Sequence, residues 1–162
     1  MWLPFDLHPE YPPEGISRAD LVRRYGEGFH RNLQLAFERE ELVYNPPAEV
    51  VPNSHAALRL TELARSQGRH GVTHDRLMQA YWEDDLNIGG SAVLRTLLQS
   101  WASTMQSRRS LRADEIRVAT GQAHAIGIDA IPAFLLERRL IVLGAQPPDV
   151  FERAFERLQQ PG

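Results

Sequence analysis

The sequence predicts an α/β fold in which short apolar strands near both ends of the chain flank a run of helices. Apolar residues alternate at the N-terminus, recur every three or four positions through the middle, and gather into short runs near the C-terminus. With 162 residues, of which 43% are hydrophobic and 24% charged, the chain is long enough to bury one core of ordinary size. The expected order is a strand, roughly five or six helices, a hairpin and a final helix.

The N-terminal part of the chain is predicted to contain a strand and two helical stretches. The alternation in residues 2–7 predicts the strand, and the prolines and glycine of residues 8–15 predict an extended loop. Ser17 and Asp20 resemble a capping box that opens a helix. The apolar face of that helix is expected to contain Leu21, Tyr25 and Phe29. A second helical stretch is expected to continue as far as Pro46.

Helices are also predicted through the middle of the chain. Asn53 or Ser54 can cap the first of them, which ends near Gly68, and Thr73 can cap the next. Their apolar stripes contain, in order, Ala57, Leu60 and Ala64; Leu77 and Ala80; Leu94, Leu98 and Trp101; and Ile116, Ala119, Ala123 and Ile126. Gly127 then occupies the left-handed position that commonly follows a helix.

The C-terminal segment is predicted to form a β-hairpin and a helix. Residues 131–136 and 140–143 are apolar runs that the polar residues 137–139 separate. Pro147 and Pro148 then precede a segment whose apolar residues have the spacing of an amphipathic helix. The chain therefore ends in a strand, a strand and a helix.

The composition excludes several kinds of chemistry. The sequence has no cysteine, and its 18 basic residues are all arginine. Such a polypeptide carries no thiol nucleophile, disulfide, cysteine-ligated metal, Schiff-base lysine or phosphate-loop lysine. The net charge of −3 predicts no nucleic-acid partner and no membrane partner. Without an apolar run of membrane-spanning length or a signal peptide in the sequence, a cytoplasmic protein is expected.

The polar clusters of the sequence favour structural roles over catalytic ones. His70 and His74 are four residues apart, but Gly71 and the expected cap Thr73 separate them, so a solvated loop is expected and no metal site. Residues 83–85 are acidic and are also expected in a solvated loop. The serines expected at helix starts, Ser17, Ser54 and Ser91, lack the surroundings of a nucleophile. No catalytic residue and no cofactor are therefore predicted.

Several segments together resemble the DsbA family, and specifically its FrnE-like branch. The most specific are residues 125–134, Ala-Ile-Gly-Ile-Asp-Ala-Ile-Pro-Ala-Phe, and residues 144–148, Gly-Ala-Gln-Pro-Pro. Residues 4–9, Pro-Phe-Asp-Leu-His-Pro, resemble the second strand of these proteins and the loop after it. Residues 51–54, Val-Pro-Asn-Ser, resemble the start of their inserted helical domain. The resemblance covers the whole chain.

The resemblance implies a thioredoxin-like fold with a helical insertion. Residues 1–16 and 110–162 would form the thioredoxin-like portion, and residues 17–109 the inserted domain. The resemblance also implies that Ala130, Ile131 and Pro132 bind the substrate. By the resemblance Pro132 would be a cis-proline, whereas the local sequence alone favours an ordinary proline at the start of a strand. The partner would be an extended peptide or thiol substrate, or glutathione.

One departure from the family decides the functional expectation. In DsbA-like proteins a central strand and a Cys-x-x-Cys helix precede the strand that here corresponds to residues 2–7, and this sequence contains neither. We therefore expect an N-terminally truncated domain, with Met1 at an internal start codon, that is redox-inactive as written. The alternatives are a relative of the kappa-class glutathione-dependent isomerases and transferases, or a non-catalytic interaction scaffold. A homodimer is also left open.

Overall fold

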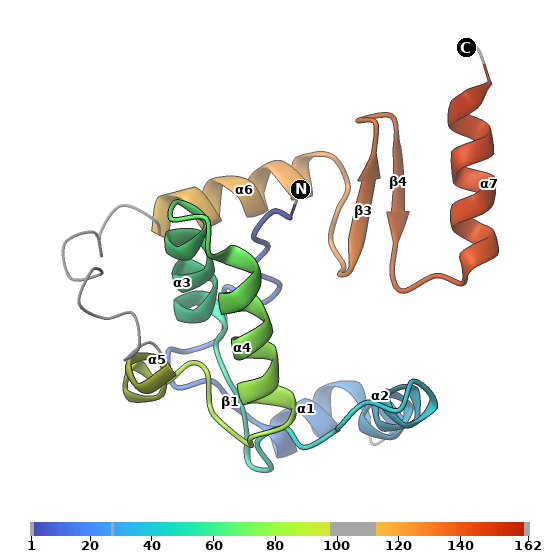
Figure 1. The fold of residues 1–162 in the computed structure, drawn as a ribbon. Coiled ribbons are helices and arrows are strands. Elements are labelled where there is room, and N and C mark those ends of the chain that lie inside the picture. The colour runs from blue at the N-terminus through green and yellow to red at the C-terminus, as the bar shows by residue number, and fades with distance from the viewer. Residues whose placement is uncertain (1, 27, 98–112, 161–162) are drawn as a thin grey trace. The chain divides into compact units, whose positions relative to one another are not determined.

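The structure is a computed structural model that describes residues 2–26, 28–97 and 113–160 (Figure 1). By its internal contacts the chain divides into two compact units. One unit is His8–Ile116, and the other combines Met1–Leu7 with Arg117–Gly162.

The unit His8–Ile116 is mainly helical. Its complete helices are α1 (Arg18–Tyr25), α2 (Gly28–Arg39), α3 (His55–Arg65), α4 (His70–Trp82) and α5 (Ser91–Leu97). One buried cluster joins Ala57 and Leu60 of α3 to Leu77 and Ala80 of α4. Ala80 is fully buried, and its small side chain allows these two helices to approach closely. The apolar stripes predicted for both helices therefore form the core of this unit.

The start of α1 is confirmed as predicted, but its length is not. The amide of Asp20 donates a hydrogen bond to the Ser17 hydroxyl (3.0 Å), and that hydroxyl donates to the Asp20 carboxylate (2.6 Å). The helix ends at Gly26, whose positive φ of 83° is incompatible with its continuation. Phe29 consequently belongs to α2, and Tyr25 is exposed rather than part of one long apolar face.

A short strand pair in the same unit has no signal in the sequence pattern. Strand β1 (Ile16–Ser17) pairs antiparallel with β2 (Val50–Val51). The amide of Arg18 extends the pairing through a hydrogen bond to the Glu49 carbonyl (2.9 Å). This pairing joins the beginning of α1 to the segment that leads into α3.

The other unit contains the predicted hairpin and the C-terminal helix. Helix α6 (Ala113–Ala125) leads into it, and β3 (Ala133–Leu136), β4 (Leu140–Leu143) and α7 (Pro148–Gln159) follow. Strands β3 and β4 are antiparallel, with Ala133 opposite Leu143 and Leu136 opposite Leu140. The ring of Phe134 meets the ring of Phe151 on α7 edge-on at 4.9 Å. Helix α7 therefore packs on the hairpin, and the predictions for this segment are confirmed.

Other predicted features also differ from the structure or lie outside its described part. Helix α2 ends at Arg39, so the helical stretch predicted to continue as far as Pro46 is shorter than expected. Residues 2–7 form no strand, because no described residue offers them a ladder partner. Ile126 lies beyond the end of α6 and is half exposed, so the buried face of that helix ends earlier than predicted. Leu98 and Trp101 lie outside the described residues.

In the part of the chain that the structure describes, no helix is both long and apolar enough to cross a membrane. The division into residues 1–16 with 110–162, and 17–109 as an insertion, stays a prediction.

Candidate functional site

The predicted substrate-binding residues lie in the loop between α6 and β3, and the end of α6 sets the direction of this loop. The amide of Gly127 donates to the His124 carbonyl (2.9 Å), and that of Ile128 donates to the Ala123 carbonyl (2.9 Å). Gly127 has a φ of 84°, as expected for the left-handed residue after a helix. Ile128 is buried next to this turn. The chain is thereby anchored just before the candidate site.

The loop itself faces solvent. Ala130, Ile131 and Pro132 are all exposed, and the peptide bond between Ile131 and Pro132 is cis. The carbonyl of Pro132 accepts a hydrogen bond from the Gly144 amide (2.7 Å), which anchors the second end of the loop to β4. Among the described residues, none forms a hydrogen bond with the backbone of Ile131.

The same hydrogen bond identifies the open edge of β3. Because antiparallel ladders alternate, a bond at Pro132 means that Phe134 and Leu136 also pair with β4. The N–H and C=O groups of Ala133 and Leu135 then point away from β4, as those of Ile131 do. Within the described residues β3 and β4 form a two-stranded sheet, so this edge has no partner there. The loop and the edge together form one row of available backbone groups.

This arrangement can bind a ligand through its backbone, but its side chains supply no nucleophile. Ala130, Ile131 and Pro132 have no ionisable side chain, and the sequence has no cysteine. Unpaired backbone groups along a sheet edge can instead hydrogen-bond an extended peptide. On α6, which precedes the loop, the Thr120 hydroxyl accepts a hydrogen bond from the amide of Asp6 (3.0 Å), and the ring of His124 meets the ring of Phe5 at 5.2 Å. These contacts hold the N-terminal segment on the last turns of α6.

The loop predicted around His70 and His74 is not present, because both residues lie in helix α4. Helix α4 begins at His70 rather than after Thr73, whose hydroxyl donates to the Arg69 carbonyl (2.8 Å). The histidine rings are therefore on one helical face, nearly parallel, with centroids 6.0 Å apart. Burial, reinforced by the charge of Arg65, lowers the pKa of His70. Among the described residues, no three histidine, aspartate or glutamate side chains converge on a metal-binding position.

The acidic run has the structural role expected of it. Glu83, Asp84 and Asp85 are exposed and follow the end of α4, which confirms the predicted solvated loop. Asp84 forms an ion pair with Arg76 (2.8 Å). These carboxylates are therefore surface groups.

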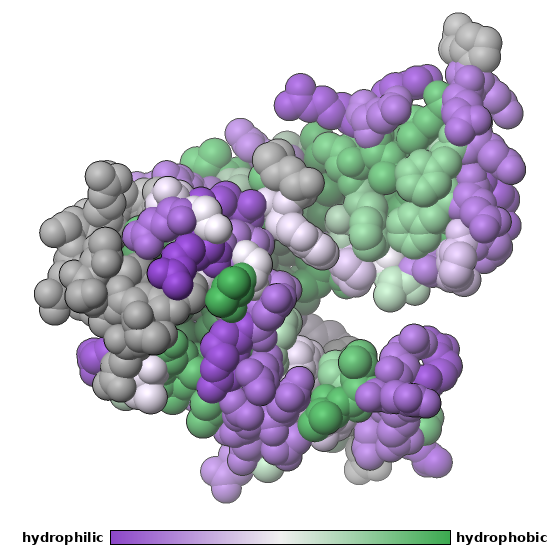
Figure 2. Space-filling model, viewed as in Figure 1, coloured by the Kyte–Doolittle hydropathy of each residue, from purple (hydrophilic) through white to green (hydrophobic). Residues whose placement is uncertain are grey.

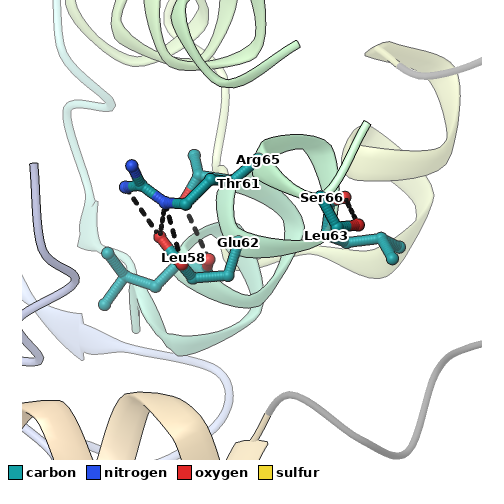
Figure 3. Close-up of polar contacts among 6 residues, drawn as sticks. All are labelled: Leu58, Thr61, Glu62, Leu63, Arg65 and Ser66. Atoms are coloured by element: carbon teal, nitrogen blue, oxygen red, sulfur yellow. Dashed lines mark hydrogen bonds and ion pairs between the residues drawn. The ribbon is translucent and has the colours of Figure 1, made fainter. Parts of the chain in front are cut away.

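One buried acid, Glu62, was not singled out from the sequence. It lies in the middle of α3, where an acidic residue normally indicates a solvent-facing position. Its carboxylate accepts hydrogen bonds from the Arg65 guanidinium at 3.0–3.1 Å (Figure 3). Figure 3 also shows Thr61 and Ser66 donating to the carbonyls of Leu58 and Leu63, so the polar groups around Glu62 are satisfied within the helix. Glu62 is therefore structural.

A groove beside β4 was also missed. Its lining includes residues 140–143 of β4 together with Arg153 and Arg157 of α7. The spacing of these arginines was a visible signal, but an arginine pair on an amphipathic helix is usually a solvated surface.

Comparisons with known proteins agree with this architecture. The family model of DSBA-like thioredoxin domains matches residues 1–156. The uncharacterized protein YwbO of Bacillus subtilis is 25% identical over 98% of this chain and 82% of its own length. The crystal structure of a probable DsbA oxidoreductase from Streptomyces coelicolor has the same fold, with a TM-score of 0.81 at 23% identity over 98% of this chain and 75% of that one. The chain belongs to the family of DSBA-like thioredoxin domains.

Proposed function

We propose that the chain is a FrnE-like, DsbA-family domain that holds an extended thiol or disulfide substrate along residues 130–135. The exposed backbone of Ile131, continuous with the open edge of β3, is the observation that carries this proposal. An extended peptide laid along this edge can pair with Ile131, Ala133 and Leu135 in turn. Glutathione, a thiol-containing tripeptide, is the smallest ligand of this class.

The proposal includes the absence of turnover by this polypeptide alone. Thiol–disulfide exchange begins when a thiolate attacks a disulfide sulfur, and the attacking sulfur becomes part of a mixed disulfide. The sequence of 162 residues contains no cysteine and supplies no such thiolate. In this proposal the chain binds the substrate and does not itself carry out the exchange. The FrnE-like resemblance implies a cytoplasmic site of action, and this location is part of the proposal.

Amide chemical shifts of the 162-residue protein test the binding surface. Reduced glutathione and an extended peptide with a central S-methylcysteine are the probes. We expect both to shift the amide signals of Ile131, Ala133 and Leu135. The Ile131→Ala variant keeps these backbone groups but loses the exposed apolar side chain beside them, so it should bind the peptide severalfold more weakly. Ile126→Ala is the matched control, because each isoleucine is 50% exposed and Ile126 precedes the loop.

Four outcomes contradict the proposal. Shifts confined to other residues would place the ligand elsewhere, and equal effects of the two isoleucine variants would remove the role of the loop. Binding of glutathione without binding of the peptide would favour a relative of the kappa-class glutathione enzymes. Insulin reduction at a rate typical of a dithiol enzyme would contradict the absence of turnover.

A further inference from the structure

A groove of about 340 Å³ runs between β4 and α7. On the strand side it is lined by the consecutive residues Leu140–Leu143. Successive strand residues point to opposite faces of a sheet, so a groove that touches all of them follows the strand edge rather than one face. Figure 1 shows α7 alongside β4, and Figure 2 shows apolar side chains gathered over the hairpin with hydrophilic ones along α7.

The backbone of β4 has available hydrogen-bonding groups along this groove. Val142 and Leu140 pair with β3, so Ile141 and Leu143 direct their N–H and C=O groups toward the opposite edge. The Gln146 side-chain amide donates a hydrogen bond to the Leu143 carbonyl (2.7 Å), in agreement with this direction. Both groups of Ile141 and the N–H of Leu143 face the groove without a partner among the described residues.

The helix side of the groove is positively charged. Val150, Arg153, Ala154 and Arg157 line it, with the spacing of one helical face. Arg153 forms an exposed ion pair with Asp149 (2.6 Å), and no described residue pairs with Arg157. The lining contains no carboxylate, and Glu152 and Glu156 are not part of it. The groove is thus positive although the chain carries a net charge of −3.

We propose that this groove binds an acidic peptide as an added strand on the free edge of β4. The peptide backbone would pair with Ile141 and Leu143, and its carboxylates would face Arg153 and Arg157. Alternate residues of a strand are about 6.8 Å apart. Residues separated by four positions in a helix are about 6 Å apart along the axis. Carboxylates at alternate peptide positions therefore match the two arginines.

This site is distinct from the proposed substrate site. The proposed thiol substrate uses the loop at Ile131 and the outer edge of β3, whereas the acidic peptide uses the outer edge of β4. The hairpin lies between the two edges. An experiment can therefore contradict the proposal for one site without contradicting the proposal for the other.

Fluorescence anisotropy with a labelled octapeptide of alternating valine and glutamate tests the proposal. We expect saturable binding that weakens with added salt, because the contact is between charges near the surface. The double variant Arg153→Gln, Arg157→Gln should bind about tenfold more weakly. The matched control is Glu152→Gln with Glu156→Gln, on the same helix but outside the groove, and it should not bind more weakly than the parent chain.

A second measurement identifies the edge. The bound peptide should shift the amide signals of Ile141 and Leu143, and the Ile131→Ala variant should bind it normally. Equal binding of an alternating valine–lysine peptide would overturn the proposal, as would an unchanged affinity of the double arginine variant. Shifts on β3 instead of β4 would overturn it, and so would absence of binding at about 1 mM peptide, the weak limit of specific recognition.

Discussion

Gly15 lies just before β1 with a φ of 86°, and a Cβ atom there would lie 2.4 Å from the carbonyl oxygen of Val51. Gly15→Ala therefore combines an unfavourable backbone conformation with a clash against a backbone atom. We expect it to lower the free energy of unfolding by about 2–4 kcal/mol, measured by urea denaturation.

Gly68→Ala is the control for this prediction. Gly68 also has a positive φ, of 70°, but nothing lies within 4 Å of its Cβ position. Its substitution should cost only about 1 kcal/mol, the penalty of the backbone conformation alone. Equal losses in the two variants would show that the contact with Val51 is unimportant.

His70 gives the stability of the protein a defined pH dependence. Burial is the main cause that lowers its pKa from the ordinary value of 6.5. The unfolded chain then binds a proton more readily than the folded chain, so stability rises with pH in this range. We expect the contribution of His70 to be fully present above pH 6.5 and to be lost as the pH falls through the lower folded-state value. His70→Gln should remove this part of the dependence in denaturation curves between pH 7.5 and pH 5, roughly the range of histidine titration.

The opposite result would assign the pH dependence elsewhere. If His70→Gln and the parent chain lost stability in parallel on acidification, another group would be responsible. His74→Gln is the control on the same helical face, one turn further along α4.

The turn between β3 and β4 carries backbone strain. Glu137 and Arg138 have φ values of 50° and 58°, a region that favours glycine and asparagine. Glu137→Asn combined with Arg138→Gly should stabilise the hairpin by about 1 kcal/mol and raise the melting temperature. Arg139→Gly, outside the positive-φ region, should lower it instead. A melting temperature that falls in the double variant would contradict this reading of the turn.

The elements with a strong local signal were predictable from the sequence. The stripe of Ala57 and Leu60 gave α3, and the β-branched run of residues 140–143 gave β4. Predictions were wrong where the structure of a segment depends on which other segment it packs or pairs with. Strand pairing between β1 and β2 depends on partners distant in the chain, and residues 2–7 have strand-like alternation without a described partner. The start of α4 was placed too late because His70 and Gly71 are poor local helix signals.

In the sequence, only the family resemblance points to the candidate site, and its role in binding stays a proposal. Ala130, Ile131 and Pro132 have no side-chain chemistry, so their periodicity and spacing contain no functional information. What the structure adds is the direction of their backbone groups, which depends on the hydrogen bond between Gly144 and Pro132. The groove at Arg153 and Arg157 can likewise be recognised only when the pairing of β4 with β3 is known.

Buried apolar side chains are unevenly distributed between the two units. In the described part of the unit that contains the hairpin, the buried apolar side chains are Ile128, Val142 and Ala154, whereas α3 and α4 share a larger cluster. Local stability follows the amount of buried apolar contact. We expect the amides of β3 and β4 to exchange with deuterium faster than those at Leu60 and Leu77. Equal protection of both regions would show that the two units unfold together.

The amide of Gln146 also influences how the protein behaves in concentrated solution. A carbonyl left bare on a strand edge is a template on which further copies can stack. Such head-to-tail stacking has no closing symmetry, so it grows into filaments rather than stopping at a pair. By covering the Leu143 carbonyl, Gln146 removes one position from that template. Hydrolysis of this side chain to a glutamate during storage would replace the donor with a repelling acceptor and return the Leu143 carbonyl to that template.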